Sequence, residues 1–129
     1  MRLDPNGHVP IYLQIVEGIR SGVAREVYRV GEPLPSVREL GLKLGVNPNT
    51  VQRAYEQLER EGLIESHRGK GMFVRRKGPT SARNQSTAAV TLGLEEALRA
   101  GRAAGIPPER IERLFELAMD RVFAREIHK

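Results

Sequence analysis

Residues 36–62 read SVRELGLKLGVNPNTVQRAYEQLEREG, and this segment contains the start and stop signals of two successive helices. Ser36 stands three residues before Glu39, which is the Ser-x-x-Glu spacing of a capping box, in which each side chain accepts a hydrogen bond from the backbone amide of the other residue. The pattern therefore predicts a short helix over Val37–Leu44. Gly45 ends this helix, because glycine readily adopts the left-handed conformation that a helix end needs.

A second helix follows almost at once. Asn47 and Pro48 predict its start, since asparagine caps free backbone amides and proline has no amide to leave unpaired at the first helical position. The apolar residues that follow recur on one helical face up to Gly62. Only about three residues join the two helices, so the angle between them must be sharp, as in a helix-turn-helix.

The flanking sequence completes a winged helix-turn-helix. Upstream, apolar residues recur every four positions over 11–23 and predict another helix. Downstream, two runs of β-forming residues flank the glycine-rich sequence 68–71 and predict a β-hairpin. We therefore predict a mainly α fold, in which residues 1–76 form a winged helix-turn-helix domain with the hairpin as its wing.

The remaining residues predict a two-helix tail. Residues 77–87 are small and polar, which is typical of a linker, and two helical segments follow over 88–129. A tail of about forty residues is too short to be stable on its own core. It either folds back on the first domain or, as we expect, packs against the same tail of a second subunit in a C2 dimer. The predicted dimer interface consists of Leu94, Leu98, Ile111, Leu114, Phe115, Ala118 and Val122.

The composition excludes several classes of protein. The 129 residues include no cysteine, so no disulfide, thiol nucleophile or cysteine-based zinc site is possible. His8, His67 and His128 are scattered, and no metal-ligand, phosphate-binding or triad pattern accompanies them. We predict no enzymatic activity, no cofactor and no metal. The sequence has neither a membrane-spanning apolar run nor a signal peptide, which predicts a cytoplasmic protein.

Positive charge is concentrated near the predicted wing. The formal net charge is +5, and the stretch 68–77 contains five basic residues and no acidic one. Such a cluster indicates an anionic polymer or a membrane surface as partner, or simply a solvated hairpin. Its position directly after a helix-turn-helix favours double-stranded DNA.

The second helix of a helix-turn-helix enters the major groove. The helical spacing points Asn49, Gln52 and Arg53 outward, where asparagine and glutamine can pair with adenine and arginine with guanine. Thr50 and the free amides of the first turn suit a phosphate oxygen, because the helix dipole is positive there. Asn47 is either a DNA contact or a helix cap, and we favour the cap.

Two further segments complete the predicted DNA-binding surface. Ser36 and Arg38 begin the helix that crosses the DNA backbone. Arg38 binds a phosphate or a base edge, or else pairs with Glu39 or Glu32 as an ordinary surface arginine. Two basic side chains and two glycines at the hairpin tip allow close approach to phosphates or to a minor groove. These wing residues are Arg68, Gly69, Lys70 and Gly71.

Four stretches, 10–15, 34–40, 45–64 and 68–74, closely resemble the GntR family of bacterial transcription regulators. With its short two-helix tail the chain resembles the YtrA subfamily, whose members are dimeric repressors, often of operons for ATP-driven transporters. The resemblance implies a DNA contact by Arg38, phosphate binding by Thr50 and a wing-tip glycine at Gly69.

Two residues depart from the family pattern. Gln52 stands where the family frequently has arginine, which leaves open the base that is read there. Gly41 replaces the usual alanine, and should weaken its helix by about 1 kcal/mol unless close packing requires a glycine.

The sequence therefore predicts a dimeric, sequence-specific repressor that binds a pseudo-palindromic operator with half-sites about one helical turn apart. The alternatives are a winged-helix adaptor for protein interactions and a non-specific nucleic-acid-binding protein. The sequence does not name a small-molecule effector.

Overall fold

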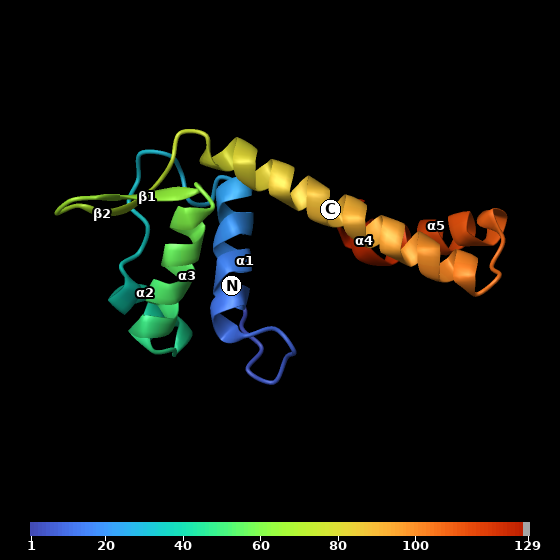
Figure 1. The fold of residues 1–129 in the computed structure, drawn as a ribbon, viewed down its shortest axis with the longest axis horizontal. Coiled ribbons are helices and arrows are strands. Elements are labelled where there is room, and N and C mark those ends of the chain that lie inside the picture. The colour runs from blue at the N-terminus through green and yellow to red at the C-terminus, as the bar shows by residue number, and fades with distance from the viewer. Residues whose placement is uncertain (128–129) are drawn as a thin grey trace. The chain divides into compact units, whose positions relative to one another are not determined.

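The computed structural model describes residues 1–127 and divides the chain into two compact units, residues 1–87 and 88–129. The predicted tail therefore includes two residues, one of them His128, that lie outside the described residues. In chain order the elements are α1 (Ile11–Ala24), α2 (Val37–Leu44), α3 (Pro48–Arg60), β1 (Ile64–His67), β2 (Gly71–Val74), α4 (Gly78–Ala103) and α5 (Pro108–Ile127) (Figure 1).

The predicted helix-turn-helix is confirmed by the local hydrogen bonds. Ser36 Oγ accepts a hydrogen bond from the Glu39 amide at 3.0 Å, and Glu39 Oε1 accepts one from the Ser36 amide at 3.2 Å. Gly45 ends α2 with a φ of 70°. Asn47 caps α3, since its Oδ1 accepts a hydrogen bond from the Asn49 amide at 2.8 Å. Each of these helix ends is thus determined by residues close together in the sequence.

Gly41 lies where α2 meets the turn into α3. It is buried, and a Cβ atom at this position would lie 2.9 Å from the backbone oxygen of Val46. The Gly41 carbonyl also accepts a hydrogen bond from the Val46 amide at 2.9 Å. Close packing of backbone against backbone therefore accounts for the glycine.

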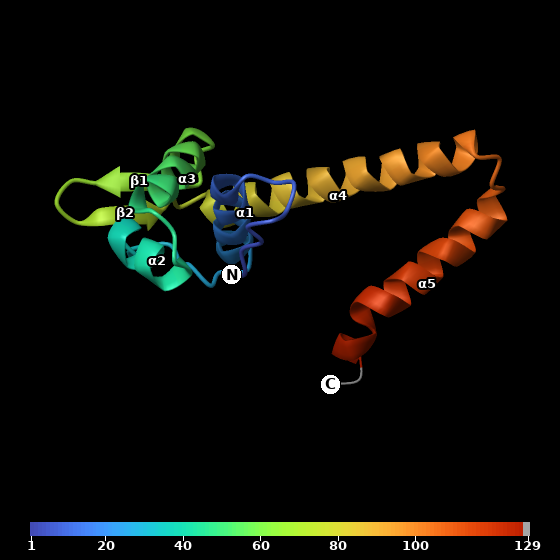
Figure 2. The ribbon, with the colours of Figure 1, turned by 90° about the horizontal axis from the view of Figure 1, so that it is seen from below.

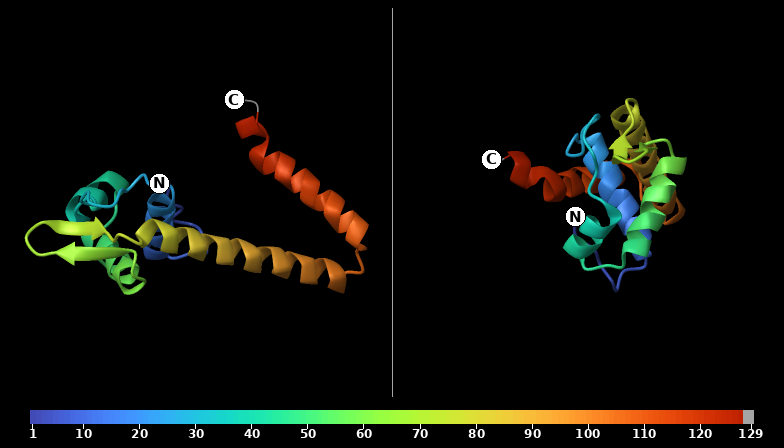
Figure 3. Two further views of the ribbon diagram at one scale, coloured as in Figure 1. Left: turned by 90° about the horizontal axis from the view of Figure 1, so that it is seen from above. Right: turned by 90° about the vertical axis from the view of Figure 1, so that its left-hand side faces the viewer.

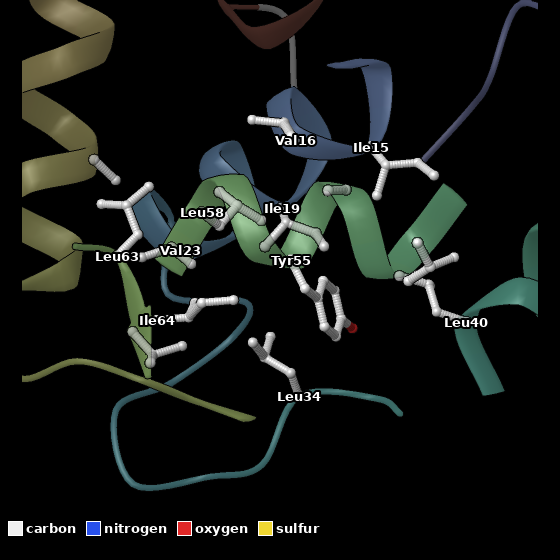
Figure 4. Close-up of a cluster of buried hydrophobic side chains, with 14 residues drawn as sticks. Ile15, Val16, Ile19, Val23, Leu34, Leu40, Tyr55, Leu58, Leu63 and Ile64 are labelled. Carbon is white, nitrogen blue, oxygen red and sulfur yellow. The ribbon is translucent and has the colours of Figure 1, made fainter. Parts of the chain in front are cut away.

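The core of the first unit lies between α1, α3 and the sheet (Figure 4). Its largest fully buried side chains are Ile15, Val16, Ile19, Val23, Val51, Tyr55, Leu58, Leu63 and Ile64. The Tyr55 hydroxyl donates a hydrogen bond to the Pro35 carbonyl at 2.6 Å, which ties α3 to the segment before α2. Burial raises the pKa of Tyr55, so the hydroxyl stays protonated and remains a donor.

The wing is an antiparallel hairpin in which Ile64 of β1 lies opposite Val74 of β2 (Figure 2). A third segment pairs with the outer edge of β2, through bridges from Val30 to Val74 and from Pro33 to Phe73. This pairing covers a strand edge that would otherwise be open and anchors the base of the wing to the rest of the unit.

The predicted linker at 77–87 is helical instead. Helix α4 begins at Gly78, and Gly78, Pro79 and Ala82 are buried in the first unit. A Cβ atom at Gly78 would lie 2.8 Å from the Leu63 carbonyl oxygen. Arg83 Nη1 donates a hydrogen bond to the Ala24 carbonyl at 2.9 Å. A composition typical of linkers thus forms a helix here, because small residues allow this close packing and proline is tolerated in a first helical turn.

The second unit consists of the rest of α4 and of α5, which diverge from the turn around Gly105 (Figure 3). At the turn, Ile111 fills the space beside Gly101, where a Cβ atom would lie 2.8 Å from Ile111 Cδ1. None of the side chains from residue 88 to residue 124, the part of this unit whose burial is described, is buried. These two helices therefore have no hydrophobic core of their own.

Candidate nucleic-acid interface

Helix α2, helix α3 and the wing border one open groove of about 850 Å³. Four predicted site residues line it, namely Ser36 from the start of α2, Gln52 from α3, and Lys70 and Gly71 from the wing tip. These residues come from three separate stretches of the sequence. Figures 2 and 3 show the hairpin tip extending beyond the helices beside it. The fold thus creates one concave surface from the three elements that were predicted to bind DNA.

Arg38 lies outside this groove. It lines a smaller hollow of about 390 Å³ together with Gly41, Gly45 and Pro48. Within residues 1–127 the Arg38 side chain forms no ion pair. The Glu39 carboxylate instead accepts a hydrogen bond from the Ser36 backbone amide. The structure therefore does not show the alternative in which Arg38 is a paired surface arginine.

The N-terminus of α3 differs from the prediction in one respect. Pro48 has no amide, the Asn49 amide donates to Asn47 Oδ1, and the Thr50 amide donates to the Asn47 carbonyl at 2.9 Å. The expected free amides of the first turn are therefore already paired within the chain. The half-buried Thr50 side chain remains as a potential phosphate ligand, and Asn47 is a helix cap, as we favoured.

Arg53 has an aromatic partner that sequence reasoning missed. Its guanidinium carbon lies 3.7 Å from the centroid of the Tyr12 ring of α1. Such a cation–π contact contributes about 0.5–1 kcal/mol at an exposed site. It holds the guanidinium against α1, while Arg53 as a whole is still exposed. No local pattern could have indicated this contact, since Tyr12 and Arg53 are far apart in the sequence and meet only through the packing of α1 on α3.

Gln52 also has a partner on its own helix. Its Nε2 donates a hydrogen bond to Glu56 Oε1 at 3.2 Å, and both side chains are exposed. The i, i+4 spacing is the signal that could have indicated this pair from the sequence.

The wing combines a braced stem with a free basic tip. The His67 ring stacks on Phe73 with 4.3 Å between ring centroids, and its Nε2 lies 3.3 Å from Glu65 Oε1. At the tip, Gly69 and Gly71 have positive φ angles of 76° and 103°, which favour glycine. The neighbouring Arg68 and Lys70 side chains are exposed and form no ion pair with any residue that the structure describes.

A structural ion pair braces the other end of α3. Arg20 of α1 is bonded to Glu61 at 2.6 Å and also to Glu17. Burial lowers the pKa of Arg20, but its hydrogen bonds to the two carboxylates raise it more, so the net pKa is raised. Positive charge is thus paired at this scaffold position, whereas Arg38, Arg68 and Lys70 have no ion-pair partner among residues 1–127.

From residue 1 to residue 127, no helix combines the length and the apolar character that crossing a membrane requires. Over the same range, no group of three or more histidine, cysteine, aspartate or glutamate side chains is arranged to hold a metal ion.

A helix-turn-helix with a basic, glycine-tipped wing defines a winged-helix DNA-binding protein. Residues 11–74 match the family model described as bacterial regulatory proteins, gntR family. The chain is also 33% identical over 121 residues to the HTH-type transcriptional repressor YtrA of Bacillus subtilis (strain 168), and the match covers 93% of each chain. The chain therefore belongs to the GntR family of bacterial transcription regulators, which confirms the resemblance seen in the sequence.

Solved structures give the same result. A transcriptional regulator from Oenococcus oeni is 32% identical with a TM-score of 0.75, covering 91% of this chain and 97% of that chain. The DNA-binding domain of AraR in complex with operator ORR3 is 29% identical with a TM-score of 0.51, covering 58% of this chain and 90% of that chain. The family members are DNA-binding transcription regulators and not enzymes, as predicted.

Proposed function

We propose that this protein is a homodimeric repressor that binds a pseudo-palindromic operator in its own operon, which includes transporter genes. The observation that carries the proposal is the groove bordered by the start of α2, by α3 and by the wing. The similarity to a repressor over nearly the whole chain supports the direction of regulation. Half-sites about one helical turn apart would match the twofold symmetry of the dimer.

The proposed DNA contacts fall into two kinds. Arg38, Thr50, Arg68 and Lys70 contact phosphates, because they are basic or hydroxyl side chains at helix starts and at the wing tip. Gln52 and Asn49 read base edges, because both are exposed on the outward stripe of α3. The remaining predicted residues support these contacts: Ser36, Asn47, Arg53, Gly69 and Gly71.

The proposed dimer forms through the second unit. Leu98 of α4 and Phe115 of α5 are each 50% exposed, and the predicted interface residues Leu94, Leu114 and Val122 are also exposed. Ile111 and Ala118 are half-buried. A second copy of the same two helices would cover these side chains and supply the core that one copy lacks.

A titration against the promoter of the protein's own gene, at two salt concentrations, tests DNA binding. Arg38→Ala and Lys70→Ala should each weaken binding and reduce the salt slope by about one, since each removes a phosphate contact. Gln52→Ala should mainly change the preferred sequence. Arg25→Ala is the matched control, because Arg25 is an exposed arginine at the end of α1 and does not line the groove.

Three outcomes separate the candidate functions. Loss of binding with Arg38→Ala and Lys70→Ala, but not with Arg25→Ala, supports the proposed surface. Equal binding to the promoter and to a random duplex indicates a non-specific nucleic-acid-binding protein instead. No binding to either DNA indicates the adaptor.

A further inference from the structure

The exposed side chains on one face of α3, the outward stripe, change from neutral to acidic along the helix. Asn49 and Gln52 are neutral, whereas Glu56 and Glu59, further along, are acidic, and all four side chains are exposed. Glu56 and Glu59 line the same groove as Gln52. Carboxylates next to a phosphate backbone weaken binding by charge repulsion. An acidic residue on this stripe therefore needs a role other than general attraction to DNA.

Glu56 has a specific partner in Gln52, since Glu56 Oε1 accepts a hydrogen bond from Gln52 Nε2 at 3.2 Å. A carboxylate offers only acceptors, so it can face the NH₂ group of the Gln52 amide but not its oxygen. The hydrogen bond consequently fixes the orientation of the Gln52 side-chain amide, with Nε2 toward Glu56 and Oε1 away from it. One N–H group and the Oε1 atom of Gln52 remain available for a base.

This orientation matters because the purines differ in the major groove. Adenine presents an acceptor at N7 and a donor at N6, whereas guanine presents two acceptors, at N7 and O6. An amide with one free N–H group and one free oxygen matches adenine. Guanine would need a second donor, and its O6 atom would also be repelled by a nearby carboxylate.

We propose that Glu56 is a positioning residue that orients Gln52, so that the Gln52–Glu56 pair selects adenine over guanine at one position of each half-site. The inference rests on the proposed function, since it needs a protein that reads DNA sequence. It assigns a role to the Gln52–Glu56 hydrogen bond, and it makes the negative charge of Glu56 part of the specificity.

The test begins with selection from a randomised duplex DNA library by the full-length protein. The position read by Gln52 is identified as the one at which Gln52→Ala no longer discriminates. Duplexes carrying adenine or guanine at that position are then titrated with each variant. Glu56→Ala should reduce the preference for adenine about tenfold. Glu56→Gln should also lose much of it, because an uncharged amide offers a donor as well as an acceptor and neither fixes the Gln52 amide nor repels guanine O6.

Glu59→Ala is the matched control, since Glu59 is exposed on the same stripe and Gln52 is bonded to Glu56 instead. It should raise the affinity for all duplexes as much as Glu56→Ala does, without changing the preference for adenine. The inference is overturned if Glu56→Ala prefers adenine as strongly as wild type, or if Glu59→Ala loses the preference equally. A wild-type protein that selects no sequence would overturn the proposed function itself.

Discussion

The two units of this chain are both rich in helix, yet they differ in what they bury. In the first unit α1 and α3 enclose a core, with side chains such as Ile15 and Leu58 fully buried. The second unit holds the last part of the 26-residue α4 and the 20-residue α5, both longer helices than α1 and α3, but no side chain described between residues 88 and 124 is buried. Helix length and apolar content thus do not make a stable unit, because burial requires a second apolar face at the right place.

Breaking the core of the first unit should have the largest effect. Leu58 is 0% exposed, so Leu58→Ala should lower the free energy of unfolding by about 2–5 kcal/mol through lost burial and the cavity left behind. Urea unfolding followed by tyrosine fluorescence measures this unit alone, because all three tyrosines lie within it. Leu42→Ala, at a residue that is 80% exposed, should change the stability by less than about 0.5 kcal/mol. Equal effects of both substitutions would mean that the core is wrongly assigned.

Placing charge on the apolar face of the second unit should break the proposed dimer. The double variant Leu98→Glu and Phe115→Glu should raise the dimer dissociation constant at least about 100-fold, because unpaired carboxylates cannot be buried in an apolar interface. Sedimentation equilibrium measures the change. The control is Leu92→Glu, because the Leu92 side chain is 56% exposed and lies about 200° around α4 from Leu94. A double variant that sediments like the wild-type protein would rule out this interface.

The first turns of α4 provide a sharper test of where the buried part of the chain ends. Ala82 is 0% exposed, so Ala82→Leu should cost about 1–3 kcal/mol by overpacking. Ala88→Leu, about two turns later on the same helix, should cost little because Ala88 is exposed. Urea titration of both variants gives the comparison. A harmless Ala82→Leu would restore the interpretation of 77–87 as a loose linker.

The smallest effect is expected from the glycines within α4. A Cβ atom at Gly93 meets no other atom within 4 Å, so Gly93→Ala should stabilise the helix by up to about 1 kcal/mol. Gly101→Ala should gain less, because its Cβ atom would displace Ile111. Thermal melting followed by far-UV circular dichroism measures both. If Gly93→Ala instead weakens the proposed dimer, Gly93 is a point of close contact between subunits.

The features that could be predicted from the sequence are those determined by near neighbours. The capping box of Ser36 and Glu39, the cap of Asn47 and the turn at Gly45 each depend on hydrogen bonds that span only a few residues. The wing was predictable for the same reason, since both strands adjoin one glycine-rich turn. The candidate site was therefore largely visible in the sequence as three separate stretches.

The features that were missed depend on distant partners. The helical start of α4 depends on contacts of residues 78–83 with Leu63, Val74 and Ala24. The contact of Arg53 with Tyr12 depends on how α1 packs on α3. Local composition carries no information about either, because each is formed only when remote segments come together.

Short-range hydrogen bonding and hydrophobic spacing encode the order of the elements, the helix-turn-helix and the basic glycine-rich wing, so these features are readable from the sequence. Two features required the folded structure: α2, α3 and the wing border one groove, and the predicted linker is the start of a helix. The tertiary structure also shows an apolar face on the second unit that the residues described within that unit leave exposed. Burial is a property of surfaces that meet in space, and the sequence determines those surfaces only through the complete fold.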